Sequence, residues 1–204
     1  MNSYIAFDLE TTGFAPETCD IIEIGAWKIK DGVAIDKFCT LVKPIMYIPM
    51  TIQNITGITM DDVADCETLD TVLVEFFDWC EDYNFLGHNL PFDYRFIEYK
   101  GKYLGLDFSL KGKRQGIDTL NLCRKYLNLD SNKLKEVANS MGIATDSTNG
   151  AFHRAGYDAY VTKLIYDRFL FQYPKVLDVI MPKSLSQDEN KYGKVVNNDT
   201  LEFN

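Results

Sequence analysis

Short apolar stretches near the start of the chain have the pattern of β-strands. Residues 3–9 and 21–30 are largely apolar, and Asp31-Gly32 after the second stretch is a strong signal for a hairpin turn. A third strand over residues 33–43 follows this turn and ends at Pro44. The start of the chain therefore predicts three strands joined as an antiparallel meander.

Further along the chain, apolar residues recur every three or four positions, which is the spacing of a helix face. An irregular stretch comes first, and Thr59 within it is placed to cap a short helical turn starting at Met60. Asn89 is a plausible N-cap for one of the longer helices. Two short strands, at 85–87 and around Ile117, separate the helical segments. The predicted helices cover residues 69–82, 90–103, 119–127, 133–141 and 155–171.

This order of elements predicts an α/β fold whose mixed five-stranded sheet, an antiparallel meander plus parallel strands, has helices on both faces. Right-handed crossovers bring the fourth strand beside the first. The carboxyl end of the first strand then lies mid-sheet, where open α/β sheets place ligands. We expect this domain to occupy residues 1–175. A polar C-terminal extension over residues 176–204 should follow, because helical periodicity fades from Pro174.

Composition places the chain among ordinary globular proteins. Its 204 residues are 46% hydrophobic and 25% charged, which suits one domain with a sizeable core. We expect neither a signal peptide nor a membrane span, because no apolar run is long enough for a bilayer. Five cysteines without C-x-x-C spacing indicate reduced thiols and a cytoplasmic protein. The net charge of −9 argues against a dedicated duplex-binding module.

Two carboxylates, Asp8 and Glu10, occupy alternate positions at the end of the first strand, so their side chains share one face. Paired charges beside a core are unfavourable unless a cation offsets them, and hard divalent cations prefer oxygen ligands. A solvated strand end is the alternative interpretation of an isolated Asp-x-Glu. Further polar clusters along the chain decide between the two.

Asp93 lies in the first turn of the helix predicted over 90–103, where the helix dipole alone would also favour an acid. Asp158 belongs to the last helix, which packs on the core. His153 lies five residues earlier, so both side chains face one site only if His153 precedes the helix. Gly150 and Gly156 make a late helix start plausible. Taken alone, His153 is more readily interpreted as an ordinary loop histidine.

Three ordered motifs connect these residues: Phe7-Asp8-Leu9-Glu10-Thr11-Thr12-Gly13, Gly87-His88-Asn89 with Phe92-Asp93, and His153-x-Ala155-x-x-Asp158. Together they resemble the DEDD superfamily of 3′–5′ exonucleases, specifically its histidine branch. That branch includes the epsilon proofreading subunit of bacterial DNA polymerase III, ribonuclease T and oligoribonuclease. The resemblance covers about residues 3–170 and implies a ribonuclease-H-like fold. One departure is Gly156-Tyr157, where relatives often have two larger apolar residues.

The resemblance implies a two-metal hydrolysis of phosphodiesters with Mg²⁺ or Mn²⁺ held by Asp8, Glu10, Asp93 and Asp158. In this interpretation Asp8 bridges both ions. Glu10 and Asp158 hold the ion that carries the attacking water, and Asp93 serves the second ion. His153 would be the general base, because histidine side chains ordinarily titrate near neutral pH.

The candidates for contact with the terminal nucleotide are Thr11, Thr12, Gly13, Phe14, His88 and Asn89. Gly13 permits close approach of the backbone, and Phe14 would stack on the terminal base by the resemblance. Core packing is the alternative for Phe14. A structural role is the alternative for His88, and helix capping is the alternative for Asn89. Basic residues in the stretch 95–114 would guide a nucleic-acid backbone or form a solvated helix face.

We therefore expect a metal-dependent 3′–5′ exonuclease that releases nucleoside 5′-monophosphates from single-stranded or frayed DNA ends. An exoribonuclease or oligonucleotide-degrading enzyme is a same-chemistry alternative, because the 2′-oxygen contacts that separate RNA from DNA leave no trace in a sequence. A polymerase-docking subunit with little turnover is an alternative of another class. It is disfavoured because such a module has no reason to keep clustered charges. The expected partners are nucleic acid with a free 3′ end and, as a candidate, a DNA polymerase.

Overall fold

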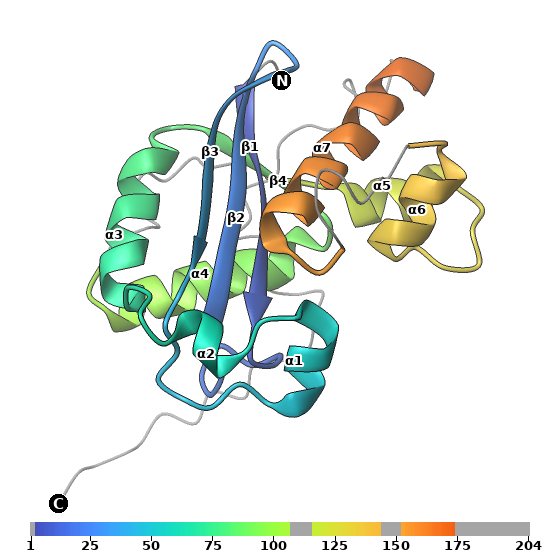
Figure 1. The fold of residues 1–204 in the computed structure, drawn as a ribbon. Coiled ribbons are helices and arrows are strands. Elements are labelled where there is room, and N and C mark those ends of the chain that lie inside the picture. Colours follow the sequence, from blue (N-terminus) through green and yellow to red (C-terminus); the bar gives the residue numbers. More distant parts are fainter. Residues whose placement is uncertain (1–2, 107–115, 144–151, 174–204) are drawn as a thin grey trace, which may run out of the picture.

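The computed structural model describes residues 3–106, 116–143 and 152–173, and these segments build a five-stranded mixed sheet (Figure 1). The strands are β1 (Ser3–Thr11), β2 (Ile21–Lys30), β3 (Val33–Leu41), β4 (Asn84–Gly87) and β5 (Gly116–Asp118). Their order is β3-β2-β1-β4-β5, with antiparallel pairing in the meander and parallel pairing from β1 through β5. The predicted ribonuclease-H-like sheet is confirmed.

Helices cover both faces of the sheet. One face packs against α3 (Leu69–Cys80) and α4 (Leu90–Tyr103). The other face packs against α5 (Thr119–Tyr126), α6 (Leu134–Ser140) and α7 (Ala155–Gln172). The short helices α1 (Met50–Thr56) and α2 (Met60–Val63) lie beyond the end of the sheet, near the carboxyl end of β1 (Figure 1).

Strand β1 is the central strand of the sheet, and its alternating side chains face two different cores. Ile5, Phe7 and Leu9 point into the core under α3 and α4, whereas Tyr4 and Ala6 point into the core under α7. Apolar residues fill both faces because helices cover both. Asp8 and Glu10 follow Tyr4 and Ala6 at alternate positions, so their carboxylates lie on the α7 face of β1. A polar site therefore borders the apolar core at this end of the strand.

The predicted elements agree with the structure except at α1 and in the side-chain capping of α4. Helix α1 lies in a stretch that was expected to be irregular. Of its seven residues only Thr56 is buried, so the helix has no buried apolar stripe. Asn89 stands at the start of α4 as predicted, but it has a left-handed backbone (φ +71°). Its side chain makes no capping hydrogen bond within the described part of the chain, so the capping role is wrong. Thr59 caps α2 in a reciprocal pair with Asp62, as predicted.

Helix α7 begins at Ala155, as predicted, so His153 lies in the turn before it. Gly25 of β2 and Gly156 of α7 allow the helix to approach the sheet closely. A Cβ at Gly25 of β2 would lie 2.0 Å from the backbone nitrogen of Gly156. A Cβ at Gly156 would lie 2.7 Å from Sγ of Cys39. This close approach explains why glycine occupies position 156, where relatives often have a larger apolar residue.

Several expectations fall on the parts of the chain that the structure does not describe. The polar extension over residues 176–204 lies outside the described residues, as do Gly150, Lys111, Lys113 and Arg114. Among the helices that the structure does describe, none combines the length and the apolar character needed to cross a membrane.

The close approach at Gly25 gives a test of the fold. Gly25→Ala should lower the free energy of unfolding by about 3 kcal/mol, because the new methyl group meets backbone atoms that cannot rotate away. Gly156→Ala is the matched control, since its methyl group meets a movable cysteine side chain and alanine favours the helix by about 1 kcal/mol. Urea denaturation of both variants measures the difference. Equal stability of the two variants would show that the helix is not held this closely.

Candidate active site

Three elements bring the predicted carboxylates together at one end of the sheet. Asp8 and Glu10 come from the end of β1, Asp93 from the first turn of α4, and Asp158 from the first turn of α7. Oδ1 of Asp93 accepts a hydrogen bond of 3.2 Å from the backbone nitrogen of Leu9, between the two acids of β1. Ligand atoms of Glu10, His153 and Asp158 all lie within 4.8 Å of one another.

Crowding and burial make these carboxylates unusually basic. The pKa values of Asp8 and Asp93 are raised well above their ordinary range, first by burial; neighbouring acids add to the shift at both. Burial, Asp158 and Glu23 raise the pKa of Glu10 to about 8. Burial raises the pKa of Asp158 to about 7. These groups therefore hold protons near neutral pH unless a cation takes the protons' place.

The donor atoms fit a divalent cation. Oδ1 of Asp158 is buried and has no hydrogen-bond partner among the described residues, while its Oδ2 accepts from the backbone nitrogen of His153 at 3.1 Å. An unsatisfied buried oxygen is unfavourable in a protein, and coordination would satisfy it. The four carboxylates offer the oxygen donors that Mg²⁺ and Mn²⁺ prefer.

His153 lies in the turn that precedes α7, which confirms its predicted place outside the helix. Its backbone adopts φ of +66°, a conformation that is uncommon for residues other than glycine. Its side chain is exposed, and its backbone nitrogen is tied to Asp158. The imidazole thus stands at the solvent side of the carboxylates, where water can reach it.

Glu23 is a site residue that the motifs did not single out. It lies opposite Glu10 in the β1–β2 pairing and is only 5% exposed. Its carboxylate accepts hydrogen bonds from the side chain of Arg154 and from the backbone nitrogen of Ala155. A glutamate in the middle of the apolar segment 21–26 was a detectable signal, but its partner lies 131 positions away in the sequence.

The turn after β1 is held by its own hydrogen bonds. The hydroxyl of Thr11 donates to the carbonyl oxygen of Gly13 at 2.7 Å, and that of Thr12 accepts from the backbone nitrogen of Asp20 at 2.8 Å. A Cβ at Gly13 would lie 2.6 Å from Sγ of Cys19. The two threonine hydroxyls therefore shape the turn, which presents Gly13 and Phe14 next to the site.

Phe14 projects from this turn into solvent. Its side chain is 83% exposed, so the core-packing interpretation of Phe14 is wrong. Its ring meets the ring of Phe92 edge to face, with centroids 6.4 Å apart, and its carbonyl oxygen accepts a 2.9 Å hydrogen bond from Nη2 of Arg95. An anchored backbone below an exposed ring is the arrangement needed for a base-stacking surface.

His88 and Asn89 have different surroundings from each other. Both ring nitrogens of His88 are engaged within the protein, Nδ1 with the hydroxyl of Thr119 at 2.9 Å and Nε2 with the carbonyl oxygen of Asn132 at 2.8 Å. This geometry favours a positioning role for His88 over contact with a substrate. The backbone nitrogen of Asn89 donates to Oδ1 of Asp118, and its exposed side chain takes no part in capping.

Three basic residues of the stretch 95–114 bind other groups of the protein itself. Lys100 pairs with Asp20 at 3.3 Å, Lys102 pairs with Glu98 at 3.4 Å, and Arg95 binds the backbone of Phe14. The described half of the stretch therefore contributes more to the frame around the site than to a free positive surface.

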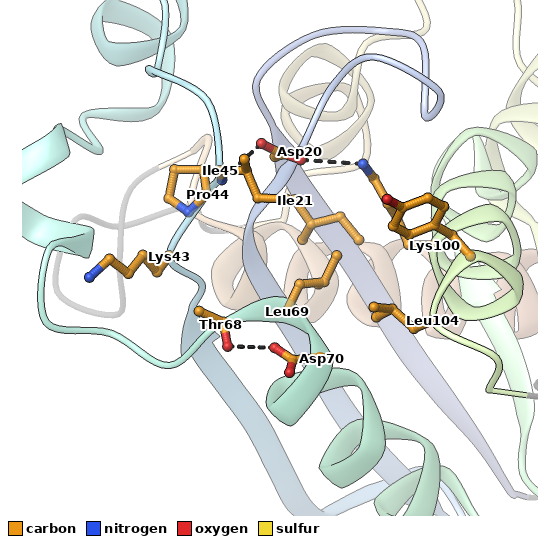
Figure 2. A pocket seen from close by; sticks show the side chains of 11 residues that line it. Asp20, Ile21, Lys43, Pro44, Ile45, Thr68, Leu69, Asp70, Lys100 and Leu104 are labelled. Carbon is orange, nitrogen blue, oxygen red and sulfur yellow. Dashed lines mark hydrogen bonds and ion pairs between the residues drawn. The ribbon is translucent and has the colours of Figure 1, made fainter.

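A cleft of about 520 Å³ lies beside Asp20, between the start of β2 and helices α3 and α4 (Figure 2). Ile21, Leu69 and Leu104 give it an apolar lining. Asp20 fixes its rim by accepting hydrogen bonds from Lys100 and from the backbone nitrogens of Ile45 and Met46. Among the described residues that line the cleft there is no member of the carboxylate cluster, so the cleft is separate from the candidate active site.

Known proteins are similar to this chain in sequence and in fold. Residues 5–166 match the model of a protein family described as exonuclease. DNA polymerase III subunit epsilon of Aquifex aeolicus is 35% identical over 82% of this chain and 80% of its own length. DNA polymerase III PolC-type of Thermotoga maritima is 38% identical over 85% of this chain, which spans 12% of that relative. The nuclease domain of 3′hExo, a DEDDh family member bound to rAMP, superposes with a TM-score of 0.71 at 21% identity, covering 84% of this chain and 93% of that one.

The raised pKa values predict how stability depends on pH and metal. Because these acids titrate higher in the folded protein, the folded state holds more protons than the unfolded chain from about pH 4 upward. The free energy of unfolding of the metal-free protein should therefore fall as pH rises from about 4 toward 8. Mn²⁺ should restore stability increasingly toward pH 8.

Urea denaturation at pH 5 and pH 8, in EDTA and in Mn²⁺, measures this dependence. Asp8→Asn removes one charge from the cluster and should flatten the decline in EDTA. Stability in EDTA that stays constant or increases over this range would contradict the electrostatic account.

Proposed function

The chain belongs to the exonuclease family, and on this premise we propose that it removes nucleoside 5′-monophosphates from the 3′ end of DNA. The observation that carries the proposal is the meeting of Asp8, Glu10, Asp93 and Asp158 beside the imidazole of His153. The resemblance to the histidine branch of the DEDD superfamily, first drawn from three motifs, is confirmed by the family match and the epsilon relative.

The four carboxylates are proposed to hold two divalent cations, Mg²⁺ or Mn²⁺. When bound, such ions offset the charge of a phosphodiester transition state and lower the pKa of the attacking water. The raised pKa values of the acids and the unsatisfied oxygen of Asp158 support this assignment. Without added cations the same groups repel one another, so the chain's own charges favour loading.

His153 is proposed to act as the general base that takes a proton from the attacking water. Its imidazole is exposed to solvent yet close to Glu10 and Asp158. Its backbone hydrogen bond to Asp158 fixes the turn from which the imidazole projects. The carboxylates, rather than His153, supply the charge that holds cations.

Substrate recognition is proposed to begin at Phe14, whose exposed ring offers a stacking surface for a terminal base of any sequence. DNA is favoured because the polymerase relatives act in its synthesis by name, and a polymerase is the proposed partner. The rAMP bound in the 3′hExo nuclease domain favours an exoribonuclease as the second candidate. The odd number of cysteines supports a cytoplasmic location as part of the proposal.

Direction and product provide the first test of activity. With Mg²⁺ or Mn²⁺, a 5′-labelled linear single strand should shorten from its 3′ end, and chromatography should show 5′-mononucleotides. EDTA should stop the reaction, and a circular single strand should resist. Asp8→Ala should abolish cleavage while leaving the protein folded, which excludes a contaminating nuclease. Opening of the circle, or a ladder of internal cuts, would overturn the proposal; faster cleavage of matched RNA would favour the second candidate.

Replacing the proposed base provides a separate test. His153→Ala should lower kcat by about 10²–10⁴-fold, because a positioned base contributes on this order. Mn²⁺ affinity, measured by calorimetry, should change little because the carboxylates hold the ions. A large loss of Mn²⁺ affinity would instead make His153 a metal ligand. Near-normal turnover at saturating metal would leave it without a role in the reaction.

A further inference from the structure

Glu23 binds the start of α7 through both of its oxygens. Oε1 accepts from Nη2 of Arg154 at 2.8 Å, and Oε2 accepts from the backbone nitrogen of Ala155 at 2.9 Å. Nε of Arg154 lies 3.2 Å from each oxygen. The carboxylate is 6% exposed and the guanidinium side chain 47% exposed, so a buried acid clamps a half-exposed arginine. Charge-assisted, forked contacts of this kind restrict orientation strongly.

The same face of β2 holds the next residues of the helix. Glu23, Gly25 and Trp27 alternate along the strand and therefore point the same way. Nε1 of Trp27 donates to the carbonyl oxygen of Gly156 at 2.7 Å, and the absence of a side chain at Gly25 lets the helix backbone lie against the strand. Arg154 itself makes no side-chain cap, and among the described residues Glu23 takes over that role for the first turn.

His153 lies directly before this clamp, in a backbone conformation that is uncommon for its residue type. Two carboxylates hold the turn: Asp158 binds the backbone nitrogen of His153, and Glu23 binds Arg154 and Ala155. We propose that Glu23, through its ion pair with Arg154, is a positioning residue that fixes the imidazole of His153 over the carboxylate cluster. This inference rests on the proposed function, in which His153 is the base.

Arg154 also makes the buried Glu23 tolerable beside Glu10. The guanidinium lowers the pKa of Glu10, opposing the acids around it, whereas an unpaired Glu23 would add another negative charge. Because Arg154 and Ala155 occupy both oxygens of Glu23, its carboxylate is committed to the turn. Glu23 thus differs in role from the four acids of the cluster, among which Asp158 has a buried oxygen without a hydrogen-bond partner among the described residues.

Glu23→Gln tests the proposal, because glutamine has the same shape and still accepts from Ala155 but loses the ion pair. We expect kcat to fall on the order of 10–100-fold, as for a misplaced catalytic group. The KM for a single-stranded oligonucleotide and the Mn²⁺ affinity should stay unchanged. Glu98→Gln, which breaks an ion pair on α4, is the matched control and should keep full activity. Arg154→Gln, at a half-exposed position, should reproduce the loss in a protein that folds.

A double-mutant cycle with His153→Ala separates positioning from a general loss of structure. If Glu23 acts through His153, Glu23→Gln should lower kcat little further in the His153→Ala background. An undiminished loss in that background would overturn the proposal. So would a kcat for Glu23→Gln and Arg154→Gln equal to that of Glu98→Gln.

A readout without substrate or metal comes from the imidazole resonances. The chain has two histidines, so His153→Ala assigns both sets of signals in a proton NMR spectrum. Glu23→Gln should shift or broaden the signals of His153 and leave those of His88 unchanged. Unchanged His153 signals would refute positioning even in an active enzyme. A wild-type protein without nuclease activity would refute the proposed function instead, and the two failures are therefore distinguishable.

Discussion

Mutual repulsion among crowded carboxylates, two of them buried and two partly buried, is the constraint on which the arrangement of this domain depends. Asp8 and Glu10 end a strand that is otherwise apolar on both faces, and two helices add Asp93 and Asp158. Carboxylates that are crowded together without a cation move apart or take up protons, and the raised pKa values of these acids reflect this effect. Rigid elements packed over two apolar cores hold these like charges together, and the proposed cations would offset them.

The close contact of α7 with β2 holds Asp158 in the cluster in spite of this repulsion. Gly25 removes the side chain that would separate helix from strand, and Trp27 and Glu23 bind the first helical residues. On the other side, Asp93 is fixed by a hydrogen bond to the backbone of Leu9. Asp93 and Asp158 are thus held by uncharged backbone groups, and the negative charge of Glu23 is balanced by Arg154.

Periodicity was enough to predict the strands and longer helices, because their buried faces repeat in the sequence. It could not reveal α1, in which Thr56 is the buried residue and no stripe exists. Motif order was enough to bring the acids and His153 to one place in the prediction. The exposure of Phe14 and the pairing of Glu23 with Arg154 depend on tertiary distances between remote segments, and a single sequence contains no record of those distances.

The separation of these residues along the chain has a consequence for biosynthesis. Three acids of the cluster are made early, but Asp158 and its histidine neighbour arrive only with α7, near the end of the domain. Contacts across so many residues form late in folding, because a long loop must close first. A nascent chain that has emerged only as far as α6 lacks both the last acid and the imidazole. Under the proposed mechanism, the residues that cut nucleic acid therefore come together only after α7 has left the ribosome and packed onto the sheet.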